Sequence, residues 1–161
     1  MEEIRRLIKE LYHSEEERNK TFKRLELIID EAVKEMTNML CSLYDSLKKD
    51  NITVRDYKGN VFDIGTGIEA YSKGIEEKII LNEEKELIYY KVRNNQLLKE
   101  KVTAEMLLNE IGFDSFYNYI KGLVKERIRM NNEDILSFRN QTSKIEKYIN
   151  ELTKGYDING D

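Results

Sequence analysis

The chain has 161 residues, of which 36% are charged and 40% hydrophobic, a length that fits one modest domain. Its only histidine is His13 and its only cysteine is Cys41, which excludes a histidine-rich metal site, a cysteine-rich zinc site and an internal disulfide. We therefore expect neither a metal nor a cofactor, and we find no catalytic constellation that would make the chain an enzyme.

The formal net charge of −4 gives no general attraction to nucleic acid and leaves only a local basic patch as a candidate. Cys41 lies in an apolar helical pattern, as expected of a buried thiol in a reducing compartment. No N-terminal run resembles a signal peptide, and no stretch of about 18 apolar residues could span a bilayer. We therefore expect a cytoplasmic protein without a membrane partner.

The first 50 residues form a long helix or coiled-coil-like segment in the sequence pattern. We expect one helix over residues 2–49, with a break near His13 as the alternative, because Ser14 and Glu17 form a capping-box pattern. The apolar residues advance in steps of three and four: Phe22, Leu25, Ile29, Ala32, Met36, Met39 and Leu43. Continued backwards, this register reaches Ile4, Ile8 and Leu11 but places Glu15 and Arg18 on the same seam. The seam either packs within the domain or mediates self-association.

Residues 51–93 read as two β-hairpins that form a small antiparallel sheet. Strands 52–57 and 61–64 flank a Lys58-Gly59-Asn60 turn, and strands 78–81 and 87–92 flank a polar turn. A glycine loop is expected to join the two hairpins.

Residues 94–154 return to helical spacing. Thr103 can cap a short helix that ends near Gly112, and Asp114 can cap another that runs to about Met130. A last helix is expected over 133–153, with the stripe Ile135, Phe138, Ile145, Tyr148, Ile149 and Leu152. Residues 155–161 are expected to be a disordered tail. The fold class is α+β in one domain, with a long N-terminal helix, two central hairpins and C-terminal helices.

The segment 61–70 carries Gly65-x-Gly67-x-x-Ala70 directly after a short apolar strand. It resembles the opening motif of S-adenosylmethionine-dependent methyltransferases, in which a strand and a glycine loop precede a helix. The resemblance covers about ten residues. It implies a methyltransferase-like enzyme as an alternative function, with the cofactor held above the glycines.

The order of helix, hairpins and helix is similar to the layout of the α-type subunit of prefoldin. In that family, hairpins assemble a barrel and helices form coiled-coil arms. The similarity is one of layout and implies assembly through sheets and helices.

A basic stripe marks the predicted helix over residues 115–130. Lys121, Lys125 and Arg129 recur every four residues, and Arg127 lies nearby. A short helix and the Gly112 turn come before this helix, which is the element order of a DNA-binding helix-turn-helix motif. It is the candidate contact for nucleic acid or a nucleotide; a solvated helix face is the plainer interpretation.

A second candidate ligand patch ends the second hairpin. Tyr89 and Tyr90 are followed by Lys91 and Arg93, so a tyrosine could stack a base while a cation holds a phosphate. The plainer interpretation has one tyrosine packed inward and the other on a wet face.

Together these features predict a non-catalytic cytoplasmic binding or assembly protein that acts through a homo-oligomer, with self-association and a protein partner expected. In size and composition it resembles a small bacterial or phage accessory protein. A nucleic-acid- or nucleotide-binding protein is the first alternative and the methyltransferase-like enzyme is the second.

Overall fold

The computed structural model describes residues 1–159, and side chains as far as residue 155. The chain divides into two compact units, Met1–Lys121 and Gly122–Asp161, whereas the sequence suggests one domain. The first unit, which we call unit 1, contains the hydrophobic core. The described part of the second unit is the continuation of one helix.

The long N-terminal helix is confirmed. Helix α1 spans Glu2–Ser42 and is followed by the single turn α2, Tyr44–Leu47. It passes through Ser14 without a break, because neither glycine nor proline occurs in this segment. Exposed ion pairs such as Arg6 with Glu10, one turn apart, support it.

A five-stranded antiparallel sheet follows, in the order β1-β2-β3-β4-β5. Its strands are β1 (Lys49–Arg55), β2 (Val61–Lys73), β3 (Glu77–Asn82), β4 (Leu87–Arg93) and β5 (Gln96–Lys101). Both predicted hairpins are present, as β1–β2 and β3–β4. The observed architecture is α+β.

Two predictions for this region are wrong. The glycine segment lies inside β2, which continues to Lys73 and pairs with β3, so the hairpins share one sheet. Residues 96–101 form a strand where helical spacing was expected. Asn94 and Asn95 both have left-handed φ values, 53° and 62°, which suit a two-residue hairpin turn, and Arg93 pairs with Gln96 across it.

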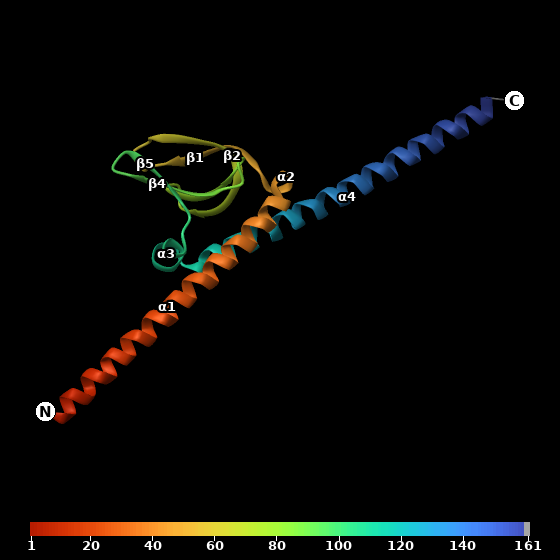
Figure 1. Cartoon of the computed structure of the whole chain (residues 1–161). Coiled ribbons are helices and arrows are strands. Elements are labelled where there is room, and N and C mark those ends of the chain that lie inside the picture. The colour runs from red at the N-terminus through yellow and green to blue at the C-terminus, as the bar shows by residue number, and fades with distance from the viewer. Residues whose placement is uncertain (160–161) are drawn as a thin grey trace. The chain divides into compact units, whose positions relative to one another are not determined.

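The sheet curls so that its first and fourth strands share one core (Figure 1). Ile52 and Val54 of β1 pack with Ile88, Tyr90 and Val92 of β4 on the inner face, although β2 and β3 lie between these strands in the sheet. The backbone N–H of Arg55, at the end of β1, also donates to the carbonyl of Ile75 in the β2–β3 turn at 2.9 Å. Curling covers the inner face without a second sheet.

Helices contribute buried residues to the remaining core of unit 1. Thr103 caps α3 (Ala104–Met106), as predicted, by accepting a hydrogen bond from the N–H of Met106. The π-helical turn η1 (Leu107–Ile111) leads to Gly112, whose φ is 85°. The buried helical residues are Ile29, Met36, Leu40, Tyr44, Ala104, Met106, Leu107, Phe116 and Ile120. Across the helix–sheet boundary, the rings of Tyr71 and Tyr119 meet edge to face at 5.7 Å.

The last helix is longer than predicted. Helix α4 spans Phe113–Asn159 in one piece, where helices ending near Met130 and starting near residue 133 were expected. The Asn131-Asn132 pair does not interrupt it, because asparagine weakens a helix far less than proline does. The predicted disordered tail starts at residue 155, within α4 as far as Asn159; its residues 160–161 lie outside the described part.

Candidate functional site

The predicted tyrosine–cation patch does not offer stacking rings. Tyr90 belongs to the inner core, and Tyr89 is buried on the other face, where its hydroxyl donates to Glu77 at 2.6 Å. Lys91 is half-buried and Arg93 is exposed. The expectation of one wet tyrosine is wrong, because the curled core covers one face of β4 and buried neighbours cover the other.

The basic stripe is present on α4 but is partly neutralised. Lys121 and Lys125 are exposed and Arg127 is half-buried. The Nε of Arg129 donates to Oε2 of Glu126 at 2.9 Å, and its guanidinium also pairs with Glu133. The hydrogen bond from Arg129 lowers the pKa of Glu126, so this carboxylate keeps its charge beside the arginine. Two free lysines make a weak site for a polyanion.

The glycines of the methyltransferase-like motif serve the geometry of the sheet. Gly65 has a φ of 106°, which other residues rarely adopt, where the β1–β2 register shifts. A Cβ on Gly67 would lie 2.4 Å from the carbonyl oxygen of Leu81 in β3. β2 runs on into an antiparallel neighbour instead of into a helix, so the strand, loop and helix implied by the resemblance are not formed.

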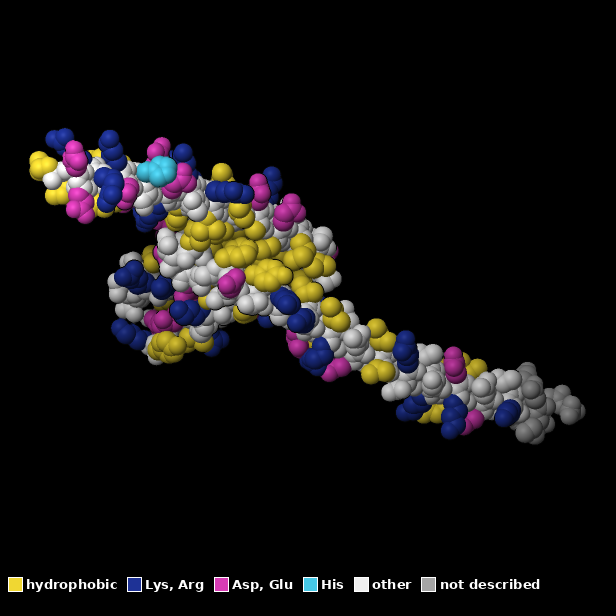
Figure 2. Space-filling view, turned by 90° about the horizontal axis from the view of Figure 1, so that it is seen from below, with side chains coloured by type: hydrophobic (Ala, Val, Ile, Leu, Met, Phe, Trp, Pro, Cys, Tyr) yellow, Lys and Arg dark blue, Asp and Glu magenta, His cyan; other side chains and the backbone are white. Residues whose placement is uncertain are grey.

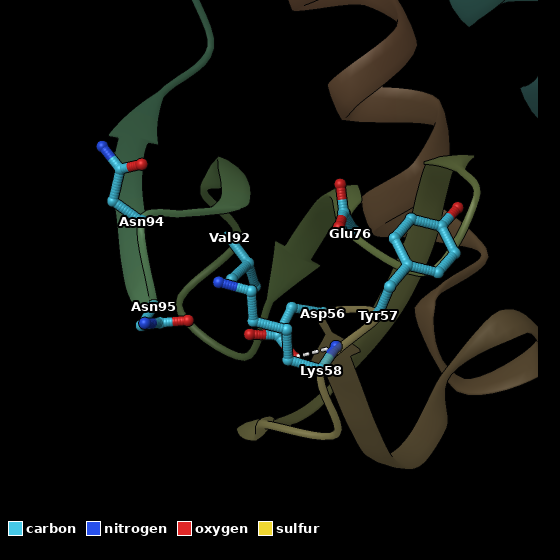
Figure 3. Close-up of a pocket in the computed structure, with 7 residues that line it drawn as sticks. All are labelled: Asp56, Tyr57, Lys58, Glu76, Val92, Asn94 and Asn95. Atoms are coloured by element: carbon cyan, nitrogen blue, oxygen red, sulfur yellow. Dashed lines mark hydrogen bonds between the residues drawn. The ribbon is translucent and has the colours of Figure 1, made fainter.

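A polar depression of about 280 Å³ lies where the curl of the sheet brings the β1–β2, β2–β3 and β4–β5 turns together (Figure 3). Its lining residues are Asp56, Tyr57, Lys58, Glu76, Val92, Asn94 and Asn95. The carboxylate of Asp56 accepts hydrogen bonds from the backbone N–H groups of Lys58 and Asn60 and from the Asn60 amide. The side-chain hydrogen bond from Asn60 is the main reason that the pKa of Asp56 is lowered.

Asp56 therefore holds the β1–β2 turn in place. The other polar groups that the depression offers a ligand are Glu76, Lys58, the Tyr57 hydroxyl and two asparagine amides. In this set no nucleophile is hydrogen-bonded to a base. Among the described residues no group of three or more His, Cys, Asp or Glu side chains could hold a metal ion.

An ionic cluster spans the first three strands. Glu69 accepts hydrogen bonds from Lys78 at 2.7 Å and Lys49 at 3.3 Å, and its side chain is only 11% exposed. Burial alone would raise the pKa of Glu69, but the two ammonium groups outweigh it and the pKa is lowered. Glu69 therefore stays charged and serves the structure of the sheet, because its carboxylate is held by Lys49 and Lys78.

The most extensive unexplained surfaces are apolar and lie on the terminal helices. Every side chain of residues 1–25 is exposed, although Ile4, Ile8, Leu11, Phe22 and Leu25 recur at heptad spacing. We call this row, with Glu15 and Arg18 between its apolar members, the α1 seam. Two further apolar residues, Leu7 and Ile28, flank it and are each 50% exposed.

A second row runs along the described part of α4. Every side chain from residue 128 to residue 155 is exposed. The heptad-spaced members, which we call the α4 seam, are Ile128, Ile135, Phe138, Ile145, Ile149 and Leu152, with Asn131 and Thr142 at the two intervening positions. Figure 2 shows hydrophobic side chains on the surface along both helices, among charged ones.

Some residues of the predicted seam from Phe22 to Leu43 pack in the core, and others remain exposed. Ile29 and Met36 are buried in unit 1, whereas Phe22, Leu25 and Met39 are exposed. The part of α1 that makes no buried contact is therefore its first half. In the sequence this half is marked only because the apolar register continues back to Ile4. Leu7 and Ile28 carry no such signal in the sequence, because they lie outside the register of the seam.

No protein-family model, no curated protein and no solved structure matches this chain. Within residues 1–159 no helix combines the length and apolar character needed to cross a membrane.

Proposed function

We propose that this chain is a non-catalytic assembly protein that works as a homo-oligomer joined through the seams of its terminal helices. The observation that carries the proposal is the exposure of both seams over stretches in which every side chain faces solvent. A cytoplasmic setting is part of the proposal and is supported by the free thiol of half-buried Cys41.

Physical chemistry supports a partner for these helices. A helix draws most of its stability from burying an apolar face, and one without tertiary contacts is marginal in water. Each large seam residue that becomes buried would stabilise an assembly by about 1 kcal/mol. Six such residues on α4 and five on α1 provide enough surface for association at micromolar concentration.

The test is the mass of the full-length chain, measured by light scattering and sedimentation over a range of micromolar concentrations. We expect a multimer that dissociates on dilution. Polar substitution within a seam, by Leu11→Asn or by Ile145→Asn, should shift the equilibrium towards monomer. Lys20→Ala and Lys147→Ala are the matched controls, because both lysines are exposed and lie off the seams.

A strict monomer across that range, with or without the seam substitutions, would overturn the proposal. Ile29→Glu is a poor choice for this experiment, since Ile29 is buried and a charge there would unfold unit 1. Far-ultraviolet circular dichroism of each variant separates lost association from lost structure.

A further inference from the structure

The α1 seam contains two charged residues at positions that otherwise carry apolar side chains. Glu15 and Arg18 follow the register of Ile8, Leu11, Phe22 and Leu25. Both are exposed, and Nη1 of Arg18 lies 4.0 Å from Oε2 of Glu15 in the same helix. Helix α1 is continuous here, so the register runs through the charged pair without a break.

From this pattern we propose that two copies of the chain pair through their α1 helices, antiparallel, about a two-fold axis midway between Glu15 and Arg18. The proposal rests on the homo-oligomer proposed above and names which surfaces meet and in which direction. The α1 seam of one copy is covered by the α1 seam of a second copy, because the seam is complementary to itself only when the two helices run in opposite directions.

Reversal brings the charges of the seam into opposite-sign contact. In an antiparallel pair of heptad helices, each a position faces a d position of the other helix. With the axis placed as above, Glu15 of one copy faces Arg18 of the other, twice. The same register sets Ile8 against Leu25, and Leu11 against Phe22. The apolar layers on both sides of the centre are then filled.

Two of the flanking pairs also match, one apolar and one of opposite charge. Leu7 of one copy lies beside Ile28 of the other, and each of these apolar side chains is 50% exposed in the single chain. The remaining flanking pairs are Arg5 with Glu26, Tyr12 with Asn19, and Ser14 with Thr21. The pairing ends near Ile28, because the next seam residue, Ile29, is already buried in unit 1.

A parallel, in-register pair of α1 helices would have unfavourable electrostatic contacts at its centre. It would set Glu15 against Glu15 and Arg18 against Arg18, so like charges would meet in adjacent layers of the seam. The α4 seam of a second copy is also a poorer occupant. The polar residues of that seam, Asn131 and Thr142, are uncharged and cannot form an ion pair with Glu15 or Arg18.

Charge exchange tests the contact in the full-length chain. Arg18→Glu or Glu15→Arg alone should weaken association about tenfold or more, because each creates two like-charge layers. The double exchange, Glu15→Arg with Arg18→Glu, should restore association close to that of the wild type. Arg24→Glu is the matched control: it makes the same charge change on an exposed residue of α1 outside the seam.

Cysteine cross-linking tests the direction. In a Cys41→Ser background, Ile8→Cys and Leu25→Cys should each give almost no disulfide dimer on mild oxidation when present alone. A mixture of the two variants should give a cross-linked dimer that joins residue 8 to residue 25. In a parallel pair, each single variant would cross-link to itself.

The two proposals fail in different ways. If the wild type is a multimer but neither the charge exchange nor the cross-linking behaves as described, the α1 pairing is wrong and assembly through another surface stands. Efficient self-cross-linking of either single variant also overturns the antiparallel arrangement. A monomeric wild type overturns both proposals.

Discussion

The hydroxyl of Tyr89 donates a 2.6 Å hydrogen bond to Oε1 of Glu77, and both side chains are at least nine-tenths buried. Tyr89 lies in β4 and Glu77 at the start of β3, so the bond ties two neighbouring strands on the outer face of the curled sheet. The tyrosine that the sequence offered for stacking a base is thus part of the architecture.

Removing this hydroxyl should destabilise unit 1. Tyr89→Phe leaves the carboxylate of Glu77 buried without its partner, a loss of about 1–3 kcal/mol in the free energy of unfolding. Urea denaturation followed by circular dichroism measures it. Tyr57→Phe is the control, since Tyr57 is largely exposed. Equal midpoints for the two variants would show that the Tyr89 bond contributes nothing net.

Unit 1 should lose stability at alkaline pH. Burial is the main reason that the pKa of Tyr119 is raised to about 12, and burial followed by the bond to Glu77 raises that of Tyr89 as well. A raised folded pKa favours the neutral phenol. Stability is therefore complete below the unfolded value of about 10 and is lost as the pH rises towards the folded value.

The measurement is the urea midpoint at about pH 9 and pH 11, with phenolate absorbance recorded in parallel. The midpoint should be lower at the higher pH, and the buried tyrosines should ionise together with unfolding. Tyr119→Phe should reduce the difference. A variant that keeps the full wild-type difference would assign the alkaline loss to other groups.

Gly67→Ala should be strongly destabilising. The new Cβ would fall 2.4 Å from the Leu81 carbonyl and 2.7 Å from Cγ2 of Ile80, so β2 would have to move away from β3. We expect a loss of about 2 kcal/mol in thermal or urea unfolding. Gly122→Ala is the matched control, because this helical glycine has open space around it and alanine favours a helix. Wild-type stability of Gly67→Ala would contradict the close strand packing.

The sequence predicted elements whose signals are local. The long helix followed from apolar spacing without glycine or proline, and both hairpins followed from β-branched runs around turns. β5 was missed because its residues, Gln96–Lys101, are mostly of types common in helices. Its strand conformation depends on pairing with β4, which precedes it by a two-residue turn, and residue propensity alone does not show that pairing.

The candidate sites were harder to predict, since they depend on what covers each face. Alternation along β4 correctly places Tyr89 and Tyr90 on opposite faces, but it cannot reveal that both faces are covered. The Gly65-x-Gly67 spacing is ambiguous for the same reason. A positive φ and a close backbone approach are needed in a cofactor loop and equally in a strand that curls against its neighbour.

The Lys78–Glu69 ion pair should stabilise unit 1 at neutral pH and contribute little in acid. Lys78→Met leaves Glu69 largely buried beside only Lys49, which we expect to cost about 2 kcal/mol near pH 7. Because the folded pKa of Glu69 is lowered, the contribution is present above the unfolded value of about 4.3 and is lost as the pH falls through the folded value. Urea unfolding at both ends of that range measures it.

Lys49→Met is the control for this pair. The Lys49 side chain is 57% exposed, so its removal should change the unfolding free energy by less than about 1 kcal/mol. A deficit of Lys78→Met that is equally large at acid pH would point to lost packing of the lysine stem instead of a lost charge pair.

The basic stripe of α4 should not act as a nucleic-acid site. Two carboxylates, Glu126 and Glu133, already pair with Arg129, and the whole chain carries a net charge of −4. We therefore expect binding to duplex DNA, single-stranded RNA and nucleotides to be undetectable at near-physiological salt and weak at low salt. Fluorescence anisotropy at two salt concentrations measures it, with Lys121→Gln, Lys125→Gln and Arg129→Gln combined in one variant.

The expectation would be contradicted if the wild type showed salt-sensitive binding and this variant lost that binding at unchanged helicity. The stripe would then be a contact surface. Binding that the variant retains would direct attention to Lys91 and Arg93, because those two cations lie on another element and are untouched by the substitutions.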